Sequence, residues 1–115
     1  MESRKNPRVD VACHLSFFAE GPTGQVIVQD KGTTCNLSWS GCSIQSPTAL
    51  DKGSYLRMTI MLPGHEATLD VDLAKVRWAN ANGFGVEFLV FNDREQARLR
   101  GFVTSRHEDS RFIVG

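Results

Sequence analysis

Residues 69–90 read LDVDLAKVRWANANGFGVEFLV, and their apolar pattern predicts the fold. Up to Leu73 the apolar residues occupy odd-numbered positions, and an alternation of period two is typical of a half-buried β-strand. From Ala74 to Trp78 they occupy even-numbered positions. A change of parity inside one strand indicates a β-bulge near residues 73 and 74, which bends the strand. The turn residues 80–83 then predict a hairpin into a last strand.

The same alternation recurs in shorter segments on the N-terminal side, separated by Gly- and Pro-containing turns. About six strands are expected, at residues 9–17, 26–28 resuming at 33–37, 41–46, 56–62, 69–78 and 84–90. Short strands with a bulge suit a closed barrel. The sequence therefore predicts an all-β fold, a six-stranded antiparallel β-barrel.

A C-terminal α-helix is expected after the last strand. Asn92 and Glu95 have the spacing of a capping box, with Asn in place of Ser or Thr. An apolar stripe at helical spacing would dock on the barrel, and it consists of Leu99, Phe102 and Val103. The charged positions expected to face water are Arg94, Arg98 and Arg106.

These patterns divide the chain into three parts. Residues 1–8 are expected to form a flexible arm, because their charges bury nothing. Residues 9–105 are expected to form the barrel with its closing helix, and residues 106–115 a disordered tail.

Composition limits the classes of function. The 115 residues suit one domain, and 13 basic and 13 acidic side chains cancel. Nucleic-acid-binding domains are usually basic, so this balance disfavours a nucleic-acid partner but permits a compact anionic ligand. No signal-peptide pattern and no apolar run of bilayer length is present, so we expect a cytoplasmic protein without membrane insertion.

The sequence offers little for catalysis or metal binding. Cys13, Cys35 and Cys42 form no CxxC pair, and we expect them to be reduced thiols that fill the core. The histidines lack a nucleophile or carboxylate at motif spacing, and no phosphate-binding glycine loop occurs. We therefore predict that the protein is not an enzyme and needs no cofactor.

Two short segments could bind an anion. Arg4 and Arg8 flank Pro7, which favours an extended backbone and places both guanidinium groups on one side of the arm. Such groups match phosphate oxygens and the O6/N7 edge of guanine, although a solvated charged arm would look the same. In the segment 36–41, alternation points Asn36, Ser38 and Ser40 to one side. Here too an ordinary polar strand end is an open alternative.

Together, RxxxR before the first strand and NxSxxG at the end of the second resemble the PilZ domain family, bacterial receptors for cyclic di-GMP. The resemblance extends from Arg4 to about Arg106 and includes the strand order, the GFGVEF stretch at 83–88 and the closing helix. It implies a PilZ-type barrel that binds cyclic di-GMP as its ligand and acts on a downstream protein partner.

The resemblance also implies roles for the arm. Arg4 and Arg8 match the two family arginines that bind guanine and phosphate. Many members have a basic residue at the position of Ser3, and Lys5 is the residue that could replace it here, without the planar fork of arginine. The number of cyclic di-GMP molecules bound is therefore left open.

On the barrel side, Asn36, Ser38 and Gly41 match the positions that line the opposite side of the ligand. Trp78 lies where members often have a further ligand contact, although a place in the barrel core is an alternative. A second possibility for the whole chain is a PilZ-type adaptor that binds no nucleotide and acts by protein–protein interaction.

Overall fold

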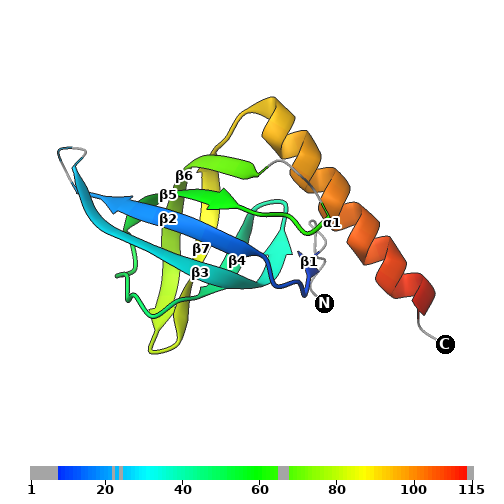
Figure 1. Ribbon diagram of the computed structural model, residues 1–115, viewed down its shortest axis with the longest axis horizontal. Helices are drawn as coiled ribbons and strands as arrows, with labels where there is room; N and C mark the ends of the chain where they lie inside the picture. Colours follow the sequence, from blue (N-terminus) through cyan, green and yellow to red (C-terminus); the bar gives the residue numbers. More distant parts are fainter. Residues whose placement is uncertain (1–7, 22, 24, 65–67, 114–115) are drawn as a thin grey trace, which may run out of the picture.

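The computed structural model describes residues 8–21, 23, 25–64 and 68–113. Within these residues the elements follow one another as a series of strands and then one helix (Figure 1). They are β1 (Arg8–Val9), β2 (His14–Glu20), β3 (Val26–Ser38), β4 (Gly41–Gln45), β5 (Tyr55–Ile60), β6 (Leu69–Asn80), β7 (Gly83–Val90) and α1 (Asp93–Ile113).

The strands form a closed antiparallel barrel. The order around the sheet is β3-β2-β5-β6-β7-β4, and β4 pairs back onto β3. The short β1 pairs with the end of β3 that β2 does not reach. The six-stranded barrel with a C-terminal helix is therefore confirmed.

The first expected strand is divided into two. Residues 10–13 leave the ladder, and the buried Thr34 of β3 bridges the gap: its hydroxyl accepts from the N–H of Cys13 (2.8 Å) and donates to the carbonyl of Val11 (2.6 Å). A side chain thus satisfies backbone groups that a regular strand would pair. The expected interruption of the second strand is wrong, because β2 pairs with β3 along residues 29–32.

Inward-facing side chains fill the barrel, and α1 covers one end of it. Phe17 and Phe84 meet edge to face at the centre, with ring centroids 5.5 Å apart. The predicted helix stripe is confirmed, since Leu99, Phe102 and Val103 are all buried. The helix packs against β1, β3 and β6 and then projects past the barrel (Figure 1). It runs to Ile113, past residue 106, where the tail was expected to begin.

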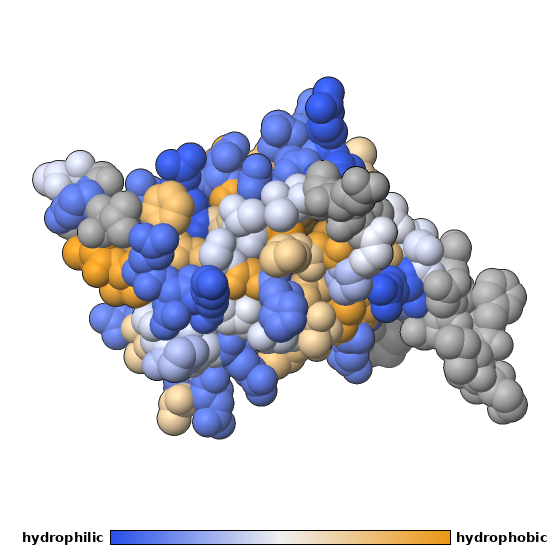
Figure 2. Space-filling model, in the orientation of Figure 1, coloured by the Kyte–Doolittle hydropathy of each residue, from blue (hydrophilic) through white to orange (hydrophobic). Residues whose placement is uncertain are grey.

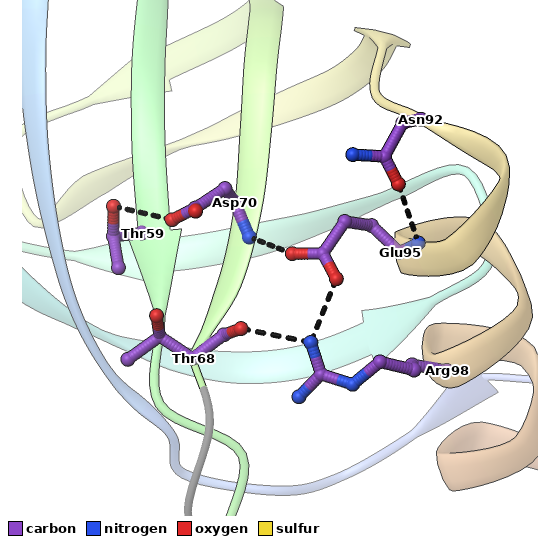
Figure 3. Close-up of polar contacts among 6 residues, drawn as sticks. All are labelled: Thr59, Thr68, Asp70, Asn92, Glu95 and Arg98. Carbon is purple, nitrogen blue, oxygen red and sulfur yellow. Dashed lines mark hydrogen bonds and ion pairs between the residues drawn. The ribbon is translucent and has the colours of Figure 1, made fainter.

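The start of α1 is attached to β6 through a buried carboxylate (Figure 3). The side-chain oxygen of Asn92 accepts from the N–H of Glu95 at 2.9 Å, as the predicted cap requires. The carboxylate of Glu95 accepts from the N–H of Asp70 at 2.7 Å and from Arg98 at 2.7 Å. Arg98 also donates to the carbonyl of Thr68 at 2.8 Å, so it does not face water as expected.

One of the cysteines differs from expectation. Cys13 and Cys42 are buried, and burial raises the pKa of both thiols. Cys35 is exposed, because a register shift between Thr34 and Asn36 turns it out of the barrel.

The surface in Figure 2 is largely hydrophilic, with an apolar area at the end of the barrel away from α1. No helix in the described part of the chain has the length and apolar character needed to cross a bilayer.

We expect Glu95→Ala to lower the free energy of unfolding by about 2 kcal/mol, because the N–H of Asp70 loses its acceptor and the ion pair with Arg98 is removed. Asp93→Ala is the matched control: it removes an exposed acid from the same helical turn and should cost about 0.5 kcal/mol. Urea unfolding measures both, and equal losses would contradict the role given to Glu95.

We also expect Ellman's reagent to modify one of the three thiols in the folded protein and all three in guanidinium chloride. Cys13 and Cys42 stay protonated and shielded because burial raises the pKa of each thiol. Cys35→Ser should abolish the reaction of the folded protein, and a persisting fast reaction would show that a buried thiol is accessible.

Candidate functional site

A groove of about 230 Å³ lies on the outside of the barrel, beside β1, the β3–β4 turn, β6 and β7. Five predicted site residues line it, namely Arg8, Asn36, Ser38, Gly41 and Trp78. The other two, Arg4 and Lys5, lie outside the described residues. Positions far apart in the sequence are therefore neighbours here.

Strand pairing places Arg8 at the groove. Arg8 is opposite Ser38 in the β1–β3 ladder, and Val9 is opposite Leu37. The side chain of Val9 is buried, whereas Arg8 is exposed. Arg8 was expected to belong to a flexible arm, but it is the first residue of β1. Its backbone is therefore fixed relative to the β3–β4 turn.

The hydroxyl of Ser38 organises that turn. It accepts from the N–H of Ser40 at 3.3 Å and donates to the carbonyl of Gly41 at 3.2 Å, and Ser38 itself is buried. The carbonyl of Ser40 in turn accepts from the N–H of Phe88 in β7, at 2.8 Å. The alternation predicted for this segment is confirmed, because Leu37 points into the core while Asn36, Ser38 and Ser40 line the groove.

Gly41 is required by a close approach between strands. A Cβ atom at this position would lie 2.1 Å from the carbonyl oxygen of Val86 in β7. A positive φ is not the reason for glycine here, since the described glycines with positive φ are Gly53 and Gly64. The motif glycine fixes how tightly β4 packs against β7.

Trp39, inside the turn, was not singled out from the sequence. Its ring packs against the core, and the guanidinium of Arg100 in α1 lies 4.9 Å from the ring centroid. The indole N–H is buried and has no hydrogen-bond partner among the described residues. Trp39 thus joins the groove-lining turn to the helix through a cation–π contact.

Trp78 lies at the surface because of a second irregularity in β6. The predicted bulge at Leu73 and Ala74 is confirmed, and another register shift occurs between Val76 and Trp78. This second shift turns Trp78 outward, where it is 44% exposed. The alternative that placed Trp78 in the barrel core is wrong.

Gly85 is the partner of Trp78 across the β6–β7 ladder and makes room for the indole. A Cβ atom at Gly85 would lie 2.1 Å from Nε1 of Trp78. The ring therefore lies across the glycine and forms part of the groove wall. A flat aromatic surface in this place can stack on a nucleobase.

Two further groove residues carry opposite charges and were not predicted. Arg77 lies within the second register shift, and Glu87 lies beside it on β7. Nε of Arg77 donates to Oε1 of Glu87 at 2.6 Å, and a second guanidinium nitrogen contacts the same oxygen. The unusual parity of β6 was the one sequence signal that could have indicated an outward Arg77.

We expect Gly85→Ala to lower the free energy of unfolding by about 1–3 kcal/mol, because the added methyl group overlaps the indole of Trp78. The indole N–H resonance of Trp78 should shift in an amide NMR spectrum. Gly101→Ala is the control: a Cβ there meets nothing within 4 Å, and the change inside a helix should stabilise the protein by about 0.5–1 kcal/mol. An unchanged Trp78 resonance in Gly85→Ala would contradict this packing.

Comparisons with known proteins agree on the fold. The solved structure of the Bacillus subtilis inhibitor of motility (MotI/DgrA) is similar with a TM-score of 0.77 and 19% identity, over 96% of this chain and 54% of that one. The chain thus spans about half the length of that protein. The PilZ domain of CeSA from a cellulose-synthesizing bacterium is similar with a TM-score of 0.61 and 16% identity, over 85% of this chain and 95% of that one.

No curated protein sequence matches the chain. The family model of the PilZ domain matches residues 2–105, which is most of its length. On this match the chain belongs to the PilZ domain family.

Proposed function

We propose that this protein is a receptor for cyclic di-GMP that signals to a protein partner. One observation carries the proposal: the groove gathers Arg8, Asn36 and Trp78 from three distant parts of a PilZ chain. These residues supply a guanidinium, an amide and an aromatic face beside one another. Cyclic di-GMP carries two phosphates and two guanines, and each of these side chains suits one of its parts.

The residues divide the recognition between them. Arg8 can donate two parallel hydrogen bonds to a phosphate or to O6 and N7 of guanine. Asn36 can pair with a base edge, and Trp78 can stack on the purine ring. Ser38 and Gly41 act mainly through the turn, because the hydroxyl of Ser38 already bonds to it and Gly41 permits the contact with Val86.

The arm supplies the remaining charge. In this proposal Arg4 and Lys5 add cations that close over the ligand from the side of β1, and the arm becomes ordered when the ligand binds. A disorder-to-order change of this kind alters the surface that a partner meets. The ligand is a nucleotide second messenger, so we place the receptor in the cytoplasm.

The helix is the element through which binding can reach a partner. It packs against β1, which carries Arg8, and it contacts the β3–β4 turn through Arg100 and Trp39. A ligand that reorganises β1 or the turn therefore acts on α1 directly. The names of the structural neighbours suggest a partner in motility or polysaccharide synthesis, and virulence control is equally compatible with the family.

One observation favours a second function, an adaptor that binds no nucleotide. Ser38 and Gly41 each have a structural role that by itself explains the residue type found there, so their presence does not require a ligand. An adaptor would bind its partner equally with and without cyclic di-GMP, which a pull-down with the ligand in excess distinguishes.

We expect the wild-type protein to bind cyclic di-GMP at micromolar concentration in titration calorimetry and Arg8→Ala to lose about 2–4 kcal/mol, because a charge-assisted bidentate contact disappears. Arg94→Ala removes an exposed arginine of α1 that does not line the groove, and it should bind like the wild type. No heat from the wild type, or equal affinity of Arg8→Ala, would refute the receptor function.

A further inference from the structure

We infer that Glu87 and Arg77 select guanine over adenine in this groove, by exchanging their mutual ion pair for contacts with the ligand. Glu87 takes the guanine base, and Arg77 takes a phosphate. The inference rests on the proposed function and assigns roles to two residues outside the RxxxR and NxSxxG motifs.

The ion pair of Arg77 and Glu87 lies where a base bound in the groove would contact it. Glu87 is opposite Gly41 in the β4–β7 ladder, and Arg77 directly precedes Trp78. All four residues line the same groove. A purine stacked on the indole of Trp78 would therefore present its edge to residues of β7 and β4.

The geometry of the pair leaves it free to exchange. Both contacts from Arg77 converge on Oε1 of Glu87, and Oε2 has no hydrogen-bond partner among the described residues. The side chains are 50% and 43% exposed. Ion pairs that face solvent contribute little to stability, so separating the two groups is cheap when each gains a new partner.

Guanine and adenine differ in what they offer to a carboxylate. Guanine presents two donors side by side on its Watson–Crick edge, N1–H and the N2 amino group, and the two oxygens of Glu87 can accept both. Adenine presents the lone pair of N1 in this place, which a carboxylate repels. A negative acceptor therefore favours one base and opposes the other.

Asn36 cannot make this distinction by itself. Its amide carries both a donor and an acceptor, so it can turn to suit either base edge. Arg77 binds a phosphate, which is identical in cyclic di-GMP and cyclic di-AMP, and Arg8 can read guanine only from the O6/N7 edge. Among the charged groove residues the structure describes, Glu87 is the acid, so it is the charged group that can accept from N1–H and the N2 amino group on the Watson–Crick edge.

The exchange also determines which basic side chains of the groove can bind the ligand phosphates. With Glu87 paired to Arg77, the described basic residue left to meet a phosphate is Arg8. When guanine engages the carboxylate, the guanidinium of Arg77 is released toward the ligand phosphates, which it can bind in bidentate fashion. A base that fails to engage Glu87 leaves Arg77 occupied, so recognition of base and phosphate is coupled.

The test measures the affinity of each variant for cyclic di-GMP and cyclic di-AMP by titration calorimetry. Glu87→Gln should narrow the ratio of the two affinities by about tenfold or more, because the amide can present a donor to adenine. Glu87→Asp should retain the preference for guanine. Arg77→Gln should weaken cyclic di-GMP binding by about tenfold and reduce its dependence on salt, while the affinity for cyclic di-AMP should change little, because Arg77 stays paired with Glu87 when adenine is bound.

Glu20→Gln is the matched control, an identical change on β2 outside the groove, and it should leave both affinities unchanged. If Glu87→Gln has the same ratio of affinities for cyclic di-GMP and cyclic di-AMP as the wild type, the role of Glu87 is overturned. The receptor function is unaffected by that result as long as binding still depends on Arg8. Arg77→Gln that binds cyclic di-GMP like the wild type, or that weakens both ligands equally, would overturn the exchange. If the wild type binds neither ligand, the proposed function fails instead.

Discussion

The approach of β4 to β7 at Gly41 is the constraint on which the groove depends. The carbonyl of Val86 occupies the space that any side chain at Gly41 would need, so the two strands meet at a distance only glycine allows. The neighbouring turn is held to β7 by the bond from the N–H of Phe88 to the carbonyl of Ser40. Because β4 also pairs with β3, the placement of β4 against β7 determines both the closure of the barrel and one wall of the groove.

The other wall depends on irregularities in the strands. Regular alternation would send Trp78 inward with Ala74 and Val76, but the second register shift in β6 sends it outward with Arg77. Gly85 then accepts the indole against the opposite strand. A bulge costs ladder pairing but re-aims a side chain, and here it supplies the aromatic face of the groove.

The sequence was sufficient for the parts of the fold that follow a simple period. The strand order, the helix stripe at Leu99 and the bulge near Leu73 could be predicted, since burial of apolar side chains fixes them. The alternation of inward and outward side chains cannot be followed past a bulge that the sequence does not reveal. For this reason Cys35 was expected in the core, and a place in the core was an alternative for Trp78. The hydroxyl of Thr34 takes the place of backbone pairing at residues 11–13. This contact joins residues far apart in the sequence, so no local sequence pattern predicts it.

The same reasoning explains why the site could be predicted only in part. The short sequence motifs place Arg8 in β1 and both Asn36 and Ser38 at the end of β3. The pairing of these two strands then brings the three residues together. Arg77 and Glu87 became groove residues only through the register of β6 against β7, where Glu87 pairs with Lys75 in the ladder but bonds to Arg77 through its side chain. Motif spacings thus locate the side of the groove built by β1 and β3, and the side built by β6 and β7 depends on three-dimensional register. In the receptor that we propose, a groove assembled in this way can keep its family motif while its opposite wall determines which base it accepts.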